Sequence, residues 1–164
     1  MKLKLTPKLA YFIGLWKGAR IPKGIGIQGD AQLLEIFTQC ALEQKLTPSG
    51  KVLRTAPNER GNGTAFFFHS AYRAYFEKVA KDQLEVFKYK NDYAANFLAG
   101  LFDSCGLVSD DGKAVVFLSR DELDEIMLLR MGFKAKRMGR NIAVMDKDKK
   151  FRGLFMKFTK RNLN

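Results

Sequence analysis

Side chains that commonly bind transition metals or activate nucleophiles are rare in this chain of 164 residues. His69 is the only histidine, and we interpret it as a strand-end residue, because no cysteine or histidine is spaced to make it a metal ligand. Cys40 and Cys105 are far apart in the sequence and form no CxxC pair, so we expect both thiols to be reduced. Together with the absence of a signal peptide, this predicts an intracellular protein of the cytoplasm, nucleoid or an organelle matrix that is not secreted.

Aspartates at predicted turns and helix ends are the other candidates for chemistry, since carboxylate oxygens are the ligands that Mg²⁺ prefers. Asp110 and Asp111 precede Gly112 between two extended segments, which is typical of a hairpin turn. Asp30 precedes a segment with helical spacing of apolar residues and is a good N-terminal cap. The alternative, in which these three carboxylates approach a common metal site, stays open from the sequence.

The chain is strongly basic, with 29 lysines and arginines against 17 aspartates and glutamates and a formal net charge of +12. A polyanion is the simplest partner for such a surface, with nucleic acid ahead of an anionic membrane. No apolar stretch is long enough to span a bilayer, so we expect no membrane partner. The hydrophobic fraction of 46% predicts a packed globule rather than a disordered basic arm.

A weak internal repeat organises the chain, because residues 11–20 align with residues 96–106. Each copy carries two small residues four positions apart, and positions four apart share one face of a helix. Small residues on that face let two helix backbones come close, so we predict that the two helices join two halves of the protein at a central seam. The predicted seam residues are Gly14, Gly18, Gly100 and Ser104.

Both halves show the same order of patterns: helix, hairpin, helix, hairpin, helix. The sequence therefore predicts an α+β chain with two antiparallel sheets, in one compact unit made of a first half at 1–90 and a second half at 91–164. A capping box of Ser119 and Glu122 is expected to begin one helix of the second half, and Asp146 to cap a basic terminal helix that ends near Lys160. Hairpins are expected at 21–29, 51–69, 107–118 and 133–145, and the remaining helices at 31–44, at 70–80 with a further helical piece to 88, and at 92–104.

The segment Leu98-Ala99-Gly100-Leu101-Phe102-Asp103-Ser104-Cys105-Gly106 resembles the LAGLIDADG signature of homing endonucleases and departs from it at the fifth, seventh and eighth positions. A more degenerate copy lies at 12–20, and the order of elements in both halves is similar to the αββαββα order of that family. The resemblance covers nearly the whole chain. It implies two pseudo-symmetric αββαββα halves joined by the paired motif helices, in a monomer that binds nucleic acid.

In the family that this chain resembles, the eighth residue of each motif is an acid that holds a divalent metal at the scissile phosphate. The aligned residues here are Ala19 and Cys105, and neither supplies the hard oxygen ligand that Mg²⁺ requires. Asp103 survives at the sixth position but lies about 200° around the helix from Cys105, and Arg20 replaces the closing glycine of the first motif. The resemblance thus implies a catalytically inactive protein without a metal cofactor. The alternative is an active, divergent DNA endonuclease that uses Mg²⁺.

The resemblance also implies that each sheet lies along the major groove of duplex DNA. Lys134 and Lys136 alternate in a predicted strand, so both are expected on one face of the sheet. Structured RNA is the alternative partner, bound by a maturase-like protein or by a component of a ribonucleoprotein. The predicted nucleic-acid-binding residues are Lys23, Gln28, Lys51 and Arg54 in the first half, and Lys134, Lys136, Arg137, Arg140 and Asn141 in the second half.

Overall fold

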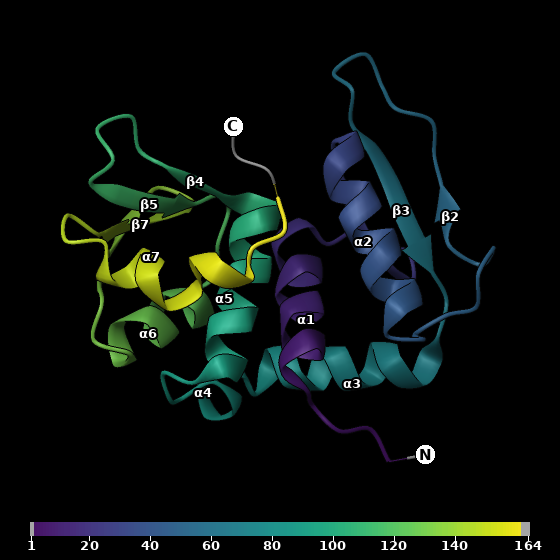
Figure 1. Cartoon of the computed structure of the whole chain (residues 1–164), viewed down its shortest axis with the longest axis horizontal. Helices are drawn as coiled ribbons and strands as arrows, with labels where there is room; N and C mark the ends of the chain where they lie inside the picture. The colour runs from purple at the N-terminus through teal and green to yellow at the C-terminus, as the bar shows by residue number, and fades with distance from the viewer. Residues whose placement is uncertain (1, 162–164) are drawn as a thin grey trace.

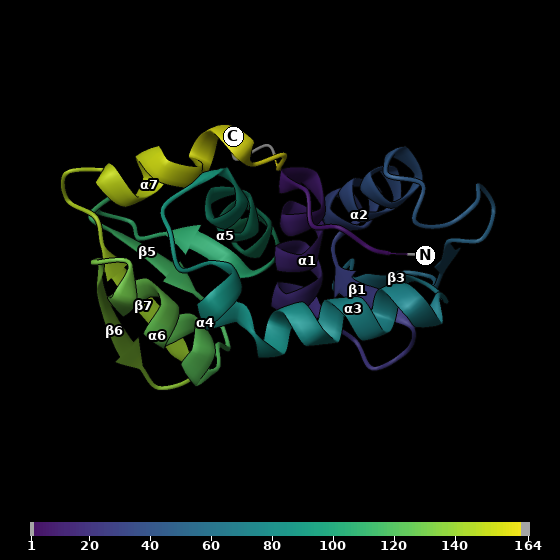
Figure 2. The ribbon, with the colours of Figure 1, turned by 90° about the horizontal axis from the view of Figure 1, so that it is seen from below.

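The structure, a computed structural model, describes residues 2–161 and has the predicted α+β architecture (Figure 1). Two antiparallel sheets lie on opposite sides of a central pair of helices, α1 and α5, as both Figure 1 and Figure 2 show. The predicted fold class is therefore confirmed. Among the described residues, no helix has both the length and the apolar character needed to cross a membrane.

The elements follow the predicted order with shifted ends. The first part of the chain contains α1 (Pro7–Ala19), β1 (Ile25–Gly29), α2 (Ala31–Glu43), β2 (Leu53–Arg54), β3 (Gly63–Phe67), α3 (Ser70–Lys81) and the short α4 (Gln83–Val86). The second part contains α5 (Asp92–Cys105), β4 (Gly106–Val108), β5 (Ala114–Phe117), α6 (Glu122–Arg130), β6 (Lys134–Met138), β7 (Asn141–Met145), α7 (Lys150–Phe155) and the 3₁₀ turn η1 (Met156–Phe158). The strand orders are β1-β3-β2 and β4-β5-β7-β6, with every neighbouring pair antiparallel.

The two central helices begin with the same kind of cap. The Thr6 hydroxyl accepts a hydrogen bond from the backbone N–H of Leu9 at 3.1 Å, before α1. The Asn91 side-chain oxygen accepts one from the backbone N–H of Ala94 at 3.1 Å, before α5. Each cap satisfies one of the backbone donors that a helix start leaves without an intrahelical partner, which is typically worth ~1 kcal/mol. The internal repeat thus extends to the local chemistry that begins each helix.

Glycines allow α1 and α5 to touch along their backbones. A side-chain carbon built on Gly14 would lie 2.1 Å from the carbonyl oxygen of Phe97, and one built on Gly100 would lie 2.0 Å from the carbonyl oxygen of Tyr11. No real side chain tolerates such distances, so a residue larger than glycine at either position would push the helices apart. The seam is therefore a contact between backbones, and it fixes how the two sheets stand relative to one another.

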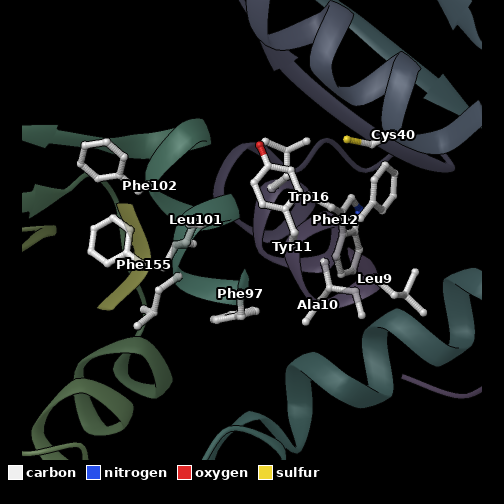
Figure 3. Packing of buried hydrophobic residues seen from close by; sticks show 14 of the residues in the cluster. Leu9, Ala10, Tyr11, Phe12, Trp16, Cys40, Phe97, Leu101, Phe102 and Phe155 are labelled. Carbon is white, nitrogen blue, oxygen red and sulfur yellow. The ribbon is translucent and has the colours of Figure 1, made fainter. Parts of the chain in front are cut away.

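A single hydrophobic cluster runs from one sheet through the seam to the other. On the side of the three-stranded sheet, the ring of Phe12 in α1 lies 5.1 Å from that of Phe37 and 6.3 Å from that of Phe67. On the side of the four-stranded sheet, the ring of Phe102 in α5 lies 5.4 Å from that of Phe155. Figure 3 shows Phe12 on one side of the paired helices and Phe102 and Phe155 on the other. The seam helices thus supply core residues to both halves.

The first predicted hairpin, at 21–29, is reduced to strand β1 and a single bridge between Arg20 and Ile27. Pro22 has no N–H to donate to a ladder, and Gly24 has a φ of 57°, which interrupts the extended backbone. The first sheet therefore has three strands, whereas the predicted pair of hairpins would have given four.

The capping box predicted for α6 is wrong. Asp121 caps this helix instead, because its carboxylate accepts a hydrogen bond from the backbone N–H of Asp124 at 3.1 Å. Ser119 has a φ of 52° and lies before the helix. An N-cap residue normally has an extended backbone, and the left-handed backbone at Ser119 does not meet this requirement.

The basic terminal helix is shorter than predicted. Lys149, and not the predicted Asp146, is the N-cap residue of α7, although the Asp146 carboxylate accepts hydrogen bonds from the backbone N–H groups of Phe151 and Arg152. The helix α7 nevertheless ends at Phe155, and one 3₁₀ turn follows. The backbone N–H of Lys160 donates to the Asp103 carboxylate at 2.7 Å, which holds the chain against α5 rather than in a continuing helix.

Candidate nucleic-acid interface

Each sheet has one face in the core and one open face. In the four-stranded sheet, Phe117, Ile142 and Val144 are buried in the core, and strand alternation places their neighbours on the opposite face. The register sets Lys134 beside Met145 on that face. The open face of the four-stranded sheet consists of Leu107, Ala114, Val116, Lys134, Lys136, Met138, Asn141, Ala143 and Met145.

In the three-stranded sheet, Ile25, Ile27 and Phe67 are buried in the core. The open face of the three-stranded sheet consists of Gly26, Gln28, Leu53, Thr64 and Phe66. Phe66 is nearly covered on this face, because the Lys23 ammonium lies 4.8 Å from its ring centroid and the Phe68 ring lies 5.7 Å away. Phe68 itself is exposed, and its ring packs edge-on against that of Phe66.

Four predicted residues lie on the open faces. Gln28, Lys134 and Lys136 are exposed there. Asn141 is half-buried, and its side-chain oxygen already accepts a hydrogen bond from the backbone N–H of Ser119 at 3.0 Å. The loop residues among the predictions, which are also exposed, are Lys23, Lys51 and Arg140.

Arg54 and Arg137, two of the predicted nucleic-acid-binding residues, lie on the core side of their sheets and not on the open faces. Arg54 is in register with Ala65 of the core face and donates to the Glu35 carboxylate of α2 at 2.9 Å. Arg137 is in register with the buried Ile142 and donates to the Glu125 carboxylate of α6 at 2.9 Å. Because side chains alternate along a strand, each arginine next to an open-face residue must point toward a helix. Both arginines therefore hold helices against the sheets.

The last turns of α1 and α5 meet where the resemblance implies metal-binding acids. Gly18 of α1 packs on Ser104 and Cys105 of α5, since a carbon built on Gly18 would lie 1.8 Å from the Ser104 hydroxyl oxygen and 3.3 Å from the Cys105 sulfur. Ala19, the next residue, packs against the core. The two positions that hold acids in the family thus carry a methyl group and a thiol.

Arg120, which no sequence pattern indicated as a site residue, occupies the end of the seam. Its guanidinium donates to the carbonyl oxygens of Lys17 at 3.4 Å and Gly18 at 3.3 Å, and it pairs with the Asp124 carboxylate at 3.3 Å. Only 9% of this side chain is exposed. A cation at the C-terminal end of a helix stabilises the partial negative charge of the last carbonyl groups. The spacing of Arg120 and Asp124 was visible in the sequence, but the contact with α1 spans about a hundred residues.

Lys17 extends this buried ionic cluster. Its ammonium donates to the Gln83 side chain and to the Asp124 carboxylate, the latter at 2.8 Å, and it lies 3.3 Å from Asp121. Only 10% of the Lys17 side chain and 1% of the Asp124 side chain are exposed. The deeply buried Asp124 carboxylate is therefore shared between two cations, Lys17 and Arg120. Arg20, the cation that the sequence placed near the metal position, instead pairs with Glu77 at 2.6 Å and stacks on Trp16.

Asp103 lies away from the end of the seam. One oxygen of its carboxylate accepts hydrogen bonds from the Tyr11 hydroxyl at 2.6 Å and from the backbone N–H of Lys160, and the other oxygen is buried with no hydrogen-bond partner within residues 2–161. Burial raises the pKa of Asp103 above its ordinary value despite these donors. Asp103 therefore connects α5, α1 and the end of the described chain, which is a structural role.

The side chains at the seam end do not fit a divalent metal of the kind that the fold's nucleases use. Neither Ala19 nor Cys105 supplies an oxygen, and burial raises the pKa of the Cys105 thiol to about 11, so this sulfur is neutral near pH 7. No group of three or more histidine, cysteine or acidic residues within residues 2–161 is placed to hold a metal. The Arg120 guanidinium would also repel a second cation.

No protein-family model matches the sequence, and a search of curated proteins gave no match. Solved structures match over almost the whole chain. Mesophilic variants of the homing endonuclease I-DmoI superimpose with a TM-score of 0.68 at 15% identity, covering 96% of this chain and 98% of theirs. A crystal structure of I-DmoI with DNA and Mn has a TM-score of 0.63 at 14% identity, covering 95% and 98%. The N-terminal LAGLIDADG domain of WhiA has a TM-score of 0.59 at 11% identity, covering 99% and 88%.

Proposed function

This chain has the LAGLIDADG fold, and on that premise we propose that it is a monomeric protein that binds duplex DNA and does not cut it. The observation that supports the proposal most directly is the arrangement of two open sheet faces on either side of the seam, in a fold that matches a nuclease crystallised with DNA. The formal net charge of +12 supplies the electrostatic attraction that binding to a polyanion requires.

The absence of cutting rests on the seam end. A two-metal mechanism needs oxygen ligands beside the scissile phosphates, and Ala19 and Cys105 provide none. Arg120 places a fixed positive charge against the last carbonyl groups of α1. This charge is compatible with a phosphate backbone above the seam and incompatible with a nearby metal ion.

The composition of the open faces predicts weak sequence discrimination. Base pairs are distinguished mainly by hydrogen bonds to base edges, yet the open face of the four-stranded sheet is largely apolar, with Leu107, Met138 and Met145 exposed. Gln28 and Thr64 of the other sheet are the polar side chains best placed for such readout. We expect contacts to phosphates to dominate the affinity, so that unrelated duplexes bind with similar strength.

The salt dependence of binding tests the proposal. Replacing Lys134 and Lys136 by alanine should weaken duplex binding and make the slope of log K against log salt shallower by about 2, because each lost phosphate contact changes the slope by ~0.9. The matched control replaces Lys78 and Lys81, two exposed lysines of α3, and lowers the charge by the same amount. Equal losses in both variants would show that the basic surface acts only through its total charge.

Two further measurements address the alternatives. Incubation of supercoiled plasmid with the protein and Mg²⁺ or Mn²⁺ should leave the plasmid intact, whereas protein-dependent nicking would establish the divergent endonuclease. Parallel titrations of duplex DNA and folded RNA at one salt concentration should favour the duplex. Tighter binding to RNA would establish the maturase-like or ribonucleoprotein alternative.

A further inference from the structure

A basic groove lies at one end of the four-stranded sheet. Its volume is about 910 Å³, and it is bounded by the start of β6, the end of β7, the first turn of α7 and the segment before α5. Four lysines line it. Part of its lining is apolar and includes Phe133. The four lysines are Lys90, Lys134, Lys147 and Lys150.

The charge in this groove is almost wholly positive. Asp146, which also lines it, is only 1% exposed and is paired with Arg152 at 2.7 Å, so its charge is compensated below the surface. Asp148 is the one exposed carboxylate among the described lining residues, and Lys150 lies 3.9 Å from it. Like charges gathered in a concave surface reinforce one another's field, so the groove should attract anions more strongly than the same lysines on a convex surface.

Two of the lysines have defined positions. The Lys90 ammonium lies 4.7 Å from the centroid of the Phe133 ring, a cation–π contact that keeps the charge inside the groove. Lys134 belongs both to the groove and to the open face of the four-stranded sheet. The groove is therefore continuous with the proposed binding surface rather than separate from it.

The other half of the molecule carries a different surface at the corresponding place. There, between the end of α2 and the start of α3, a hollow of about 440 Å³ is lined by Leu42, Lys45, Leu46, Thr47, Pro48, Ser49 and His69. This hollow has a single lysine, and much of its lining is uncharged. The two halves thus differ in charge where the repeat makes them equivalent in fold.

We infer that the basic groove binds the phosphate backbone of the duplex where it continues past the end of the four-stranded sheet. The inference rests on the proposed function and adds an asymmetry to it: the bound duplex is contacted farther from the seam on the side of the second half than on the side of the first. The recognised chemistry is a row of phosphodiesters. A single free phosphate would meet only some of the four ammonium groups.

Duplex length separates this inference from the proposed function. A core duplex is compared with a duplex extended by about one helical turn (~10 base pairs) on one side and with a duplex extended by the same length on both sides. The first extension should raise the affinity of the natural protein at least severalfold, and the second should add little, because only one side of the bound duplex meets the basic groove. No gain from the first extension, or an equal further gain from the second, would overturn the inference. Binding of the core duplex alone reports on the proposed function.

The variant with Lys90, Lys147 and Lys150 replaced by alanine should lose the gain from the first extension and keep its affinity for the core duplex. Its salt slope on the extended duplex should be shallower by about 2 to 3. The matched control replaces Lys4, Lys78 and Lys81, which are exposed and lie outside the groove. An equal loss in the control would overturn the inference.

The last experiment measures binding of the extended duplex in the presence of inorganic phosphate or of chloride at equal ionic strength. Inorganic phosphate should compete only weakly with the extended duplex. Strong competition that disappears in the triple lysine variant would show a pocket for small anions instead of a track for the backbone, and this too would overturn the inference. Thermal unfolding of each variant verifies that the replaced lysines, which are all exposed, leave the fold intact.

Discussion

At the end of the seam, a guanidinium stands beside the two positions where acids would be needed to cut. Arg120 bonds to the last carbonyl groups of α1 and shares Asp124 with Lys17. Restoring acids alone therefore does not restore a metal site. New carboxylates at positions 19 and 105 would form ion pairs with Arg120 in preference to binding a metal ion. The guanidinium is already in place, whereas a metal ion would first have to lose water from its hydration shell.

The variant carrying Ala19→Asp and Cys105→Asp is accordingly expected to bind Mn²⁺ no better than the natural protein, and the addition of Arg120→Gln should produce measurable binding. Titration calorimetry with Mn²⁺ alone checks this. The Arg120→Gln single variant is the control for nonspecific binding. Equal Mn²⁺ affinity of the double and triple variants would contradict the role given to Arg120.

The burial of Asp103 predicts how the free energy of unfolding depends on pH. Its pKa is raised in the folded protein by burial, so its ionised form costs folding free energy above the folded pKa and costs nothing below the unfolded value of about 3.9. Asp103→Asn removes this cost. The stability of the variant relative to the natural protein should therefore be most favourable near pH 7 and should decline as the pH falls toward about 4. Urea unfolding of both proteins across this pH range measures the difference in their free energies of unfolding. A difference that does not vary with pH would contradict a raised pKa of Asp103.

At the scale of elements, the seam helices depend on residues without side chains. Gly100→Ala would place a carbon 2.0 Å from the Tyr11 carbonyl oxygen and 2.7 Å from the Leu15 nitrogen, so the helices must separate. We expect a loss of about 3 kcal/mol or more in the free energy of unfolding. Gly153→Ala is the control, because Gly153 lies in α7 with open space around it. That variant should be neutral or more stable by up to about 1 kcal/mol. Similar losses in both variants would argue against a backbone contact at the seam.

The start of α6 tests which residue caps it. Asp121→Ala removes the acceptor for the Asp124 N–H and the pairing with Lys17, so the free energy of unfolding should fall by about 1 kcal/mol or somewhat more. Ser119→Ala should change it by less than about 0.5 kcal/mol, because the Ser119 backbone lies outside the helix. Chemical denaturation distinguishes the two. A larger effect at Ser119 would restore the capping box.

For the whole molecule, the shared core predicts that the two halves unfold together. One hydrophobic cluster includes residues of both sheets and both seam helices, so neither half can lose its packing without exposing the other. Far-ultraviolet circular dichroism, which follows all helices, and fluorescence of Trp16, which lies in α1, should give the same transition. Two separated transitions would instead indicate that residues 1–90 and 91–164 are independent domains.

The sequence by itself determined the features that depend on local pattern. The repeat of small residues at Gly14 and Gly100 predicted the two helices that touch, and alternation of Lys134 and Lys136 placed both on one sheet face. Helical spacing and hairpin turns gave the order of elements to within a few residues, apart from the first hairpin and the terminal helix. These inferences succeed because helix and strand periods are properties of neighbouring residues.

Only the tertiary structure decided which of the predicted basic side chains lie on the open faces of the sheets. Arg54 and Arg137 looked equivalent to the exposed lysines in the sequence, yet each forms an ion pair with a helix on the core side of its sheet. The contact of Arg120 with α1 and the gathering of Lys90 with Lys147 join segments that are distant along the chain. Such pairings depend on how the sheets pack against the seam helices. The periodicity of helices and strands describes only neighbouring residues and cannot predict contacts between segments far apart in the sequence. For this reason the order of helices and strands could be predicted from the sequence, whereas the ionic contacts of Arg120 at the end of the seam could not.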